Sequence, residues 1–253
     1  MPEIHFFEFS FDDVFSNLAL EDILIEQVSD GNLPPLVRVW QNPVSVILGI
    51  SRSIQKDVFV EQIETDQVPL ARRTSGGGTV YHDQGTLSYS FFYPWTMIGF
   101  ENDPRSVNNS TIDPFIQVII DSLASFGLKA VKSGVSDIFI EGNKISGNAQ
   151  KRKKGAILHH GTILISVDID RMSRYLKIPL ERKGIAHGDF VTSLKALGLD
   201  VGAGQLKDSL EKSLNTNHTC KEIQFESEYP QLVEKAKNLA EGSLKEKSWI
   251  FRR

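Results

Sequence analysis

Hydrophobic residues follow two different spacings in the first part of the chain. The pattern from Ile4 to Phe9 is typical of a strand, whereas the apolar positions from Val14 to Val28 recur as in a mostly buried helix. Two apolar runs follow at 36–40 and 44–48, and the Asn42-Pro43 turn signal between them predicts an antiparallel hairpin. A helix is expected near 58–65, and short strands at 68–72, 79–81 and 87–93.

A stripe of large apolar residues with helical spacing crosses the centre of the chain, and Gly127 is placed to end that helix. Its members are Ile112, Phe115, Ile116, Ile119, Ile120 and Leu123. Short strands at 137–140 and within 156–167 suit a second hairpin edge. From about residue 168 the pattern is more helical, with helices near 170–176, 206–214 and 230–239 and a strand near 221–225.

This irregular order of strands and helices predicts the fold class. It favours an α+β fold with mixed, largely antiparallel sheets flanked by helices over a Rossmann-type sheet. No repeat or long linker interrupts residues 1–253, so we expect a single domain with a more helical C-terminal portion from about residue 168.

Composition narrows the function classes. A chain of 253 residues that is 40% hydrophobic can bury one large core. With 28 Lys and Arg against 32 Asp and Glu, the net charge of -4 gives no general attraction for nucleic acid or an anionic membrane. The single cysteine, Cys220, excludes a disulfide framework and a cysteine-rich zinc site. Without a signal peptide or a run of roughly 20 apolar residues, the sequence predicts a cytoplasmic protein.

The stretch from Arg72 to Asp83 is the most informative part of the sequence. Three consecutive glycines allow the backbone to approach a ligand closely and to aim N–H groups at an anion. Arg72 and Arg73 lie beside them, and guanidinium groups suit carboxylate or phosphate. The alternative is a tight turn with solvated arginines. The stretch is neither a Walker A loop nor a dinucleotide fingerprint.

A second stretch surrounds Lys144, which lies between Gly142 and Gly147 among strand-like neighbours. In a cleft its ammonium could bridge a carboxylate and a phosphate, although a lone lysine is more often a solvated surface residue. The basic run from Lys151 to Lys154 is most simply a solvated turn, and docking of an acidic carrier domain is the alternative.

The third stretch contains adjacent histidines, His159 and His160, on a predicted strand. Neighbouring strand residues point to opposite faces, so the two cannot grip one metal together, and we expect one inward and one outward. A nucleophilic role for Ser75 or Ser146 would need a base and an orienting group that the sequence does not identify.

Together these three stretches, in this order and spacing, resemble the lipoate-protein ligase A family. The matching residues are Arg72-Arg73-x-Ser-Gly-Gly-Gly-x-Val-x-His82-Asp83, Lys144-Ile-Ser-Gly-x-Ala and His159-His160-Gly161-Thr162. The resemblance extends from about Leu36 through Lys183-Gly184-Ile185 and weakly to Trp249. It implies the catalytic-domain fold of biotin and lipoate ligases, a lipoyl-binding tunnel and ATP-dependent formation of lipoyl-AMP.

The resemblance also implies roles for individual residues. Lys144 would contact the reacting carboxylate and the α-phosphate, and Mg²⁺ would accompany ATP, with Asp137 as a candidate metal ligand. Family members commonly carry Asn before that aspartate, where this chain has Ser136. The residues expected to bind the acid or its adenylate are Arg72, Ser75, Gly76, Gly77, Gly78, His82, Asp83, Gly147, His160, Gly161 and Thr162.

The expected activity is transfer of the lipoyl group to a lysine of a lipoyl carrier domain, either a 2-oxoacid dehydrogenase E2 or the glycine cleavage H protein. Long family members continue into a small accessory domain after the tryptophan segment; this chain resembles the short form, so a separate accessory subunit is a possible partner. Two alternatives remain: an ATP-independent octanoyl or lipoyl transferase, for which Cys220 is the only cysteine, and a non-catalytic lipoyl-AMP-binding protein. The motifs do not distinguish lipoate from octanoate.

Overall fold

A six-stranded mixed sheet forms the centre of the computed structural model, which describes residues 3–99, 112–178 and 184–252. Its order is β10-β11-β6-β2-β1-β12; β1 pairs in parallel with β2 and β12, and the other neighbours are antiparallel. These strands are β1 (Ile4–Glu8), β2 (Leu36–Trp40), β6 (Thr86–Pro94), β10 (Asn148–Arg152), β11 (Ala156–Leu164) and β12 (Cys220–Glu222). The predicted α+β fold with largely antiparallel sheets is confirmed.

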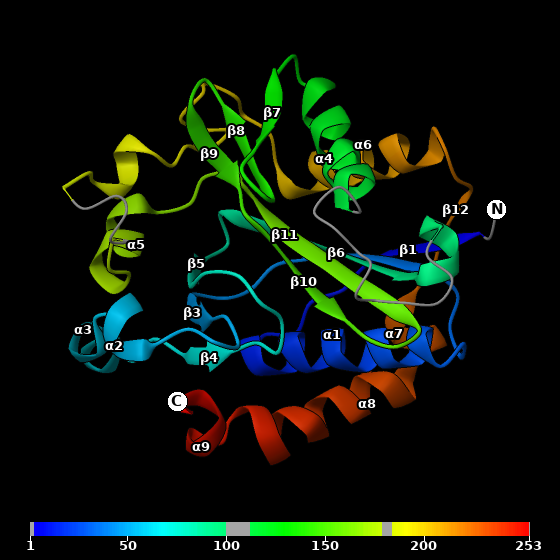
Figure 1. Ribbon diagram of the computed structural model, residues 1–253, viewed down its shortest axis with the longest axis horizontal. Coiled ribbons are helices and arrows are strands. Elements are labelled where there is room, and N and C mark those ends of the chain that lie inside the picture. The colour runs from blue at the N-terminus through cyan, green and yellow to red at the C-terminus, as the bar shows by residue number, and fades with distance from the viewer. Residues whose placement is uncertain (1–2, 100–111, 179–183, 253) are drawn as a thin grey trace.

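Helices cover both faces of this sheet, and strand alternation decides which residues face which helix (Figure 1). Leu36, Phe92 and Leu158 lie opposite one another and share a buried cluster with α1 (Val14–Ser29), which α8 (Pro230–Leu239) covers from outside. Phe91 and its neighbours on the opposite face pack in the cluster of α4 (Asp113–Ala124), which contacts α6 (Ala203–Asn215). The predicted central helix with its Gly127 terminator is confirmed, since Gly127 has φ 78°.

A second, three-stranded sheet closes one side of the region where the site lies. Its order is β4-β3-β5, from β3 (Ser45–Leu48), β4 (Leu70–Arg72) and β5 (Val80–His82). The predicted hairpin between 36–40 and 44–48 is therefore wrong: β2 pairs with β1 and β6, and β3 pairs with β4 and β5. Asn42 is fully buried and hydrogen-bonded to Asn17 and His82, so this segment carries the chain from one sheet to the other.

A third sheet, β7-β8-β9, carries the segment around Lys144 described above. Its strands are β7 (Ala130–Ser133), β8 (Asp137–Ile140) and β9 (Asn143–Ser146). The turn between β8 and β9 contains Glu141 and Gly142, both with positive φ, which places Lys144 on β9 opposite Phe139. A tight turn of this kind holds the two strands in one register.

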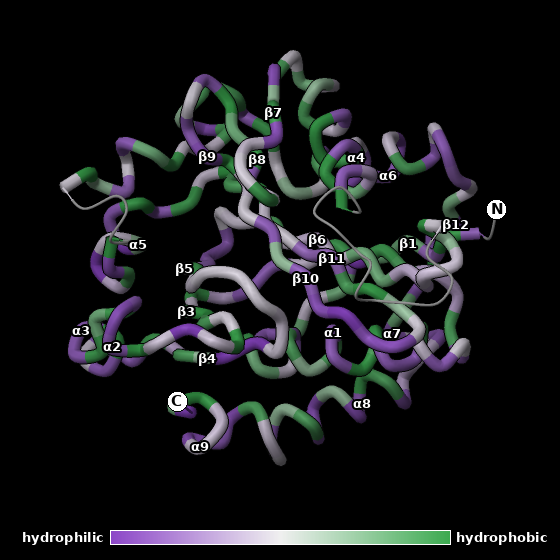
Figure 2. The backbone as a smooth tube through the Cα atoms, viewed as in Figure 1, coloured by the Kyte–Doolittle hydropathy of each residue, from purple (hydrophilic) through white to green (hydrophobic). Residues whose placement is uncertain are grey.

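The basic run 151–154 is not simply a solvated turn. Lys151 lies on β10, and its ammonium is 2.6 Å from an Asp22 carboxylate oxygen on α1; Lys153 pairs with Glu26 one turn further along. Only the remaining lysine, Lys154, is an exposed turn residue of the kind predicted. The tube of β10 is coloured as hydrophilic at this edge of the sheet (Figure 2). The sequence of this strand resembles that of a loop because Lys151 forms an ion pair with α1 instead of contributing to the apolar core.

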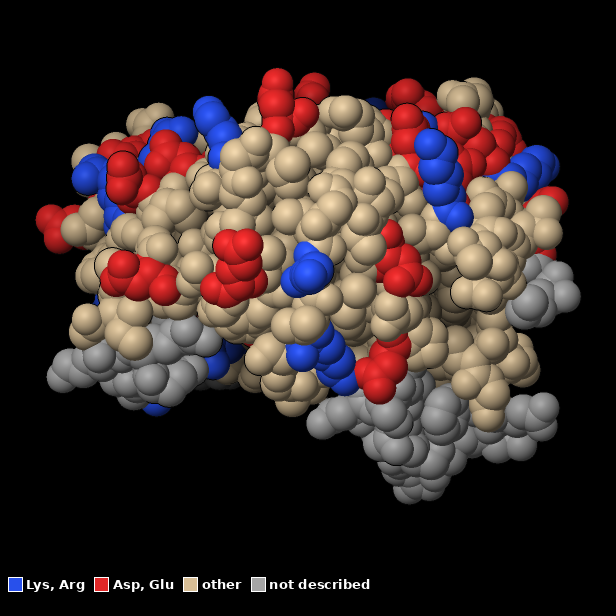
Figure 3. Space-filling view, turned by 90° about the horizontal axis from the view of Figure 1, so that it is seen from above, with Lys and Arg blue, Asp and Glu red and all other residues tan. Residues whose placement is uncertain are grey.

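The remaining elements are short, apart from the helices already named. They are α2 (Ile54–Asp57), α3 (Val60–Thr65), η1 (Trp95–Ile98), α5 (Ile169–Tyr175), η4 (His187–Asp189), α7 (Phe225–Glu228), the π-helical turn η5 (Ala240–Leu244) and α9 (Lys247–Ile250). No helix among the described residues is both long and apolar enough to cross a bilayer. Seen from above, acidic and basic side chains gather toward the two ends of this face, and isolated charged side chains lie across its middle (Figure 3).

Candidate active site

A pocket lies between the central sheet, α1, the second sheet and the lysine-bearing hairpin. Asp137 and Lys144 line it and are partly exposed, whereas Arg73, Trp40 and Ile47 line it and are buried. The complete lining is Leu18, Glu21, Trp40, Ile47, Arg73, Gly78, Thr79, Val80, His82, Ser88, Asp137, Lys144, Gly147, Asn148, Ala149, His160, Gly161 and Thr162. A cationic rim over an apolar interior suits a carboxylic acid with a long apolar tail.

The glycine loop is wound around the guanidinium of Arg73. That group donates hydrogen bonds to the Ser75 hydroxyl at 2.9 Å and to the carbonyl oxygens of Gly76 and Gly78 at 2.6 and 2.7 Å. Gly77 has φ 84°, and a Cβ there would lie 2.9 Å from Arg73 Nη2, so only glycine fits. Burial lowers the pKa of Arg73 to about 10, which leaves it charged at neutral pH.

Arg72 is turned away from this pocket. Its guanidinium donates to the carbonyl oxygens of Gly49 at 2.9 Å, Arg52 at 2.8 Å and Ile250 at 2.9 Å, and Trp249 Nε1 donates back to the Arg72 carbonyl. Arg72 therefore ties the last helix to the strand that precedes the glycine loop. The expectation that Arg72 holds the acid is not met by its placement, because adjacent strand residues point to opposite faces and it is Arg73 that lines the pocket.

Lys144 stands at the rim with its ammonium 2.8 Å from the Asp137 carboxylate. Its aliphatic end lies against Gly147, where a Cβ would come within 3.0 Å of the ammonium nitrogen. The backbone of Lys144 is held on its far side by the carbonyl of Phe190 and the N–H of Thr192, each at 2.9 Å. The ammonium is thus held by an ion pair at the pocket, while 32% of the Lys144 side chain remains exposed.

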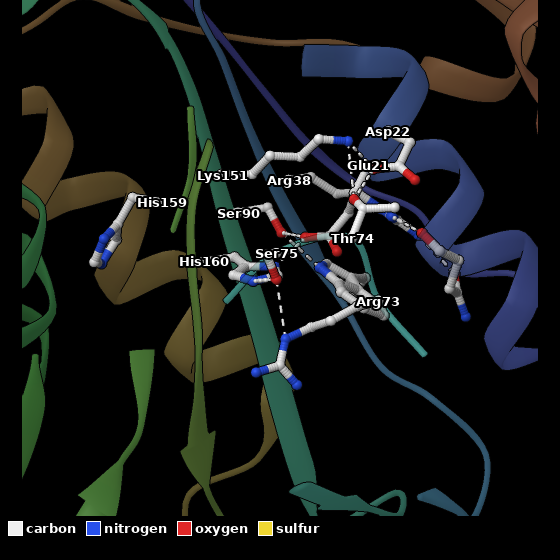
Figure 4. A network of polar contacts seen from close by, with 12 residues as sticks. Glu21, Asp22, Arg38, Arg73, Thr74, Ser75, Ser90, Lys151, His159 and His160 are labelled. Atoms are coloured by element: carbon white, nitrogen blue, oxygen red, sulfur yellow. Dashed lines mark hydrogen bonds and ion pairs between the residues drawn. The ribbon is translucent and has the colours of Figure 1, made fainter. Parts of the chain in front are cut away.

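Behind the rim lies a buried chain of polar groups that joins α1 to the glycine loop (Figure 4). Glu21 lies 2.8 Å from Nδ1 of His160, whose Nε2 lies 2.8 Å from the Ser75 hydroxyl. Ser90 donates to the same Glu21 oxygen at 2.6 Å. Burial alone would raise the pKa of Glu21, but the charge and hydrogen bond of His160 outweigh it and lower that pKa below its usual value.

The serine, histidine and glutamate supply the base and orienting group that the sequence could not identify for Ser75. Ser75 nevertheless already accepts a hydrogen bond from Arg73 and does not line the pocket. We interpret the chain as a support that fixes the glycine loop through Ser75 and Arg73. His160 itself does line the pocket, as do Gly147, Gly161 and Thr162 from the predicted set.

His159 and His160 point to opposite faces of β11, as expected (Figure 4). The prediction that one of them points outward is wrong, because helices cover both faces and both side chains are buried. His159 stacks on Phe115 of α4 with the rings 11° from parallel. Burial lowers the pKa of His159 to about 3, so this ring is a neutral core group.

His82 lines the inner end of the pocket, and Asp83 does not line it. The Asp83 carboxylate instead accepts hydrogen bonds from the backbone N–H groups of Gly85 and Asp168, both at 2.9 Å. Asp83 therefore shapes the turn after β5. In the glycine loop, Gly78 lines the pocket, whereas Gly76 accepts a hydrogen bond from Arg73 and Gly77 packs closely against the Arg73 guanidinium.

The comparisons with known proteins identify the family and the fold. The family model of the lipoyl protein ligase A/B catalytic domain matches residues 13–215, which is most of the chain. The chain belongs to this family.

Solved structures of the family share the fold over nearly the whole chain. A structure described as an archaeal bipartite lipoate protein ligase and its E2 lipoyl domain, from Thermoplasma acidophilum, matches with TM-score 0.81 and 23% identity over 99% of this chain and 97% of the other. A lipoate-protein ligase A bound with ATP matches with TM-score 0.78 and 23% identity over 98% of both chains. P. falciparum LipL1 in complex with lipoate matches with TM-score 0.75 and 27% identity over 99% and 74%.

Sequence reasoning missed several pocket residues of this lipoyl ligase domain. Glu21, a carboxylate among the apolar positions of a helix predicted to be mostly buried, was a signal that the pattern contained. Asn148 accepts from the Tyr89 hydroxyl at 2.6 Å and donates to the Ser136 carbonyl at 2.7 Å, so it joins the lysine hairpin to the central sheet. The hydroxyl of Ser136, the residue before Asp137, in turn donates a hydrogen bond to the Asn148 carbonyl.

Two further expectations concern metal and thiol chemistry. Within the described ranges, no group of three or more His, Cys, Asp or Glu side chains could hold a metal ion, and Asp137 is paired with Lys144. Cys220 does not line the pocket; it lies on β12 opposite Ile4, and burial raises its pKa to about 11. Lys183 of the Lys-Gly-Ile segment falls outside the described residues.

Proposed function

We propose that this protein is an ATP-dependent lipoate-protein ligase. The observation that carries the proposal is that two cations, Arg73 and Lys144, line one pocket together with apolar side chains such as Trp40 and Ile47. The acid's tail would lie inside and its carboxylate at the rim, beside the glycine loop. Relatives whose solved structures contain ATP and lipoate support both ligands.

In the first step a carboxylate oxygen of the acid attacks the α-phosphorus of ATP, and pyrophosphate leaves. The charge that builds on the phosphate oxygens is stabilised by the ammonium of Lys144 and the guanidinium of Arg73. Both are fixed before the reaction, Lys144 by Asp137 and Arg73 by the loop carbonyls, so little reorganisation is needed. In the second step a carrier lysine attacks the acyl carbon, an amide forms and AMP leaves.

Magnesium is part of this proposal as a companion of the triphosphate. Mg²⁺ usually keeps several waters and takes one or two protein carboxylates together with phosphate oxygens. Asp137, beside Lys144, is the pocket carboxylate that could serve. The other pocket carboxylate, Glu21, is engaged by His160 and Ser90.

The proposed acceptor is a lipoyl carrier domain of an E2 or H protein, supported by the E2 lipoyl domain named with the Thermoplasma relative. That relative is described as bipartite, which supports a separate accessory subunit as a second proposed partner. The thiol route of the transferase alternative lacks a nucleophile among the described pocket residues, because Cys220 lies outside the pocket with a raised pKa.

The test is incubation of the purified protein with ATP, Mg²⁺ and lipoate, with and without a lipoyl carrier domain, followed by mass spectrometry. Lipoyl-AMP is expected in the first case, and a lipoylated carrier in the second if no accessory subunit is needed. Lys144→Ala should reduce adenylate formation at least 100-fold, roughly the loss of one transition-state donor. Lys154→Ala removes an exposed lysine and is the matched control.

Two outcomes would overturn the proposal. Transfer from an octanoyl carrier donor without ATP would place the protein among the transferases. Tight binding of lipoyl-AMP without turnover, in the presence of every proposed partner, would make it a binding protein.

A further inference from the structure

Lys144 is carried by a small sheet whose last strand continues directly into the central sheet. β9 ends at Ser146 and β10 begins at Asn148, so only Gly147 separates the two strands. The Lys144 side chain lies against this glycine, where a Cβ would come within 2.9 Å of Lys144 Cε. The position of the ammonium in the pocket therefore depends on the contacts that hold the two sheets together beside Gly147.

Asn148 forms such contacts on the side of the lysine hairpin. Its Nδ2 donates to the Ser136 carbonyl at 2.7 Å, and the Ser136 hydroxyl donates to the Asn148 carbonyl at 3.0 Å. Ser136 directly precedes Asp137, whose carboxylate lies 2.8 Å from the Lys144 ammonium. This reciprocal pair of hydrogen bonds thus holds the residue next to the ion-pair partner of Lys144.

On the side of the central sheet, Asn148 reaches across β11 to Tyr89 on β6. Gly161 of β11 lies opposite both residues and has no side chain to block the contact. The Tyr89 hydroxyl donates to Asn148 Oδ1 at 2.6 Å. The Ser136 carbonyl can only accept, so it fixes the orientation of the Asn148 amide and makes Oδ1 the acceptor for Tyr89.

Ser146, the last residue of β9, closes this network. Its hydroxyl oxygen lies 2.9 Å from the Tyr89 hydroxyl and 3.2 Å from Asn148 Nδ2. Because the Tyr89 proton is directed at Asn148, the Ser146 hydroxyl donates to Tyr89 and accepts from Asn148. Tyr89 and Ser146 are fully buried, and the donors of all three groups are assigned, so the network has a single arrangement.

We propose that Asn148 is a positioning residue for formation of the adenylate. Held by Tyr89 on the central sheet, it fixes the segment that leads into Asp137 and, through the Asp137 carboxylate, the ammonium of Lys144. The inference rests on the proposed function, because it assumes that Lys144 and Arg73 act together on one phosphate group.

The physical reason is that the two cations belong to different parts of the fold. Arg73 is tied to the central sheet through Ser75 and His160, whereas Lys144 belongs to the third sheet. Cations stabilise the charge that develops on a phosphate group when they are fixed in advance at the right positions. A displacement of about 1 Å can reduce a rate roughly 100-fold, so the loss of one link in the network should reduce adenylation roughly tenfold.

The first experiment compares two tyrosine variants. Tyr89→Phe removes only the hydroxyl that holds Asn148, and Tyr89 itself lies outside the described pocket lining. The variant should lower kcat for lipoyl-AMP formation roughly tenfold and change KM for lipoate and ATP by less than about twofold, because the network acts on the transition state. Tyr93→Phe removes a hydroxyl from the same strand and the same face, and should keep both constants. An unchanged kcat in Tyr89→Phe overturns the inference.

A double-mutant cycle shows whether the effect passes through the lysine. In a Lys144→Ala background, Tyr89→Phe should reduce the remaining rate by less than about twofold, because there is no ammonium left to position. A loss that reflects only a less stable fold would keep its full factor in both backgrounds. Equal factors in the two backgrounds therefore contradict the positioning role.

Lysine NMR of the protein without substrates separates this inference from the proposed function. In ¹³C-lysine-labelled protein, assigned with a Lys144→Arg variant, the Cε resonance of Lys144 should shift in Tyr89→Phe and stay in place in Tyr93→Phe. If wild type forms no lipoyl-AMP and this pattern is still observed, the ligase proposal fails and the positioning of Lys144 stands. Normal formation of lipoyl-AMP, with a Lys144 resonance that does not move in Tyr89→Phe, has the reverse meaning.

Discussion

Glu21 on α1 accepts a hydrogen bond from Nδ1 of His160 on β11 at 2.8 Å, across 139 positions of sequence. The contact fixes the imidazole whose other nitrogen meets Ser75, and through it the loop around Arg73. A helix near the start of the chain thereby contributes to the shape of the glycine loop around Arg73.

We expect Glu21→Gln to lower the free energy of unfolding by roughly 1–3 kcal/mol, because an amide cannot replace a charged acceptor of two hydrogen bonds. Urea unfolding measures the loss. Glu26→Gln, on the same helix, removes only a partly exposed pair with Lys153 and should change stability by less than about 1 kcal/mol. Equal effects of the two variants would contradict the role given to Glu21.

The contacts of Arg72 should affect mainly the stability of the protein, whereas Arg73 should affect mainly adenylation. Trp249→Phe removes the hydrogen bond to the Arg72 carbonyl and should cost about 1 kcal/mol of stability, with adenylation retained in the folded protein. Arg73→Lys keeps the charge but loses the fork that holds Gly76 and Gly78, and should reduce adenylation strongly. Thermal unfolding and initial rates of adenylation, measured on the same samples, distinguish the two variants. A loss of thermal stability in Arg73→Lys without a loss of adenylation rate would contradict the placement of Arg73 in the pocket.

Stability should fall as the solution becomes mildly acidic. His159 and His82 have pKa values lowered to about 3 by burial, so between pH 6.5 and 3 the unfolded chain binds protons that the folded chain does not. Their contribution is intact above pH 6.5 and is lost as the pH falls, by roughly 1.4 kcal/mol per histidine at pH 5.5.

Urea midpoints at pH 7.5 and 5.5 measure this effect for the histidine on the α4 face. His159→Phe keeps an aromatic ring against Phe115 and removes the titrating group, so its midpoint should shift less between the two pH values than that of wild type. An identical shift in both proteins would mean that His159 accepts a proton without unfolding.

Gly161 should tolerate no side chain. A Cβ at this position would lie 2.2 Å from Asn148 Oδ1 and 2.6 Å from the Tyr89 hydroxyl, so Gly161→Ala must break the hydrogen bond between them. We expect a loss of roughly 1–3 kcal/mol. Gly204→Ala, on α6 with open space around it, should be neutral or stabilising by up to about 1 kcal/mol. Chemical denaturation of both variants checks the contrast.

The hydrophobic periodicity predicted elements that bury one apolar face in the core, such as α4. The motifs located Lys144 and the glycine loop. Periodicity failed where a strand changes sheets: the buried Asn42 reads as a turn residue because its partners, Asn17 and His82, are remote in sequence. Lys151 reads as solvated for the same reason, since Asp22 supplies its partner from α1.

The choice between Arg72 and Arg73 shows a second limit. Both suit an anion by chemistry, and only the direction of the strand that carries them decides which one reaches the pocket. Inner-end residues such as Leu18 and Trp40 carry no motif at all, because apolar side chains in a helix or strand look the same whether they face a core or a ligand.

The contact between Arg72 and the last helix has a consequence for synthesis of the protein. The guanidinium and carbonyl of Arg72 meet Ile250 and Trp249, which are 178 and 177 positions later in the chain. During translation the guanidinium and carbonyl of Arg72 therefore cannot form these two hydrogen bonds until Trp249 and Ile250 have emerged from the ribosome. A nascent chain halted before them would carry the glycine loop, the lysine segment and the paired histidines, and would still lack the C-terminal contacts of Arg72.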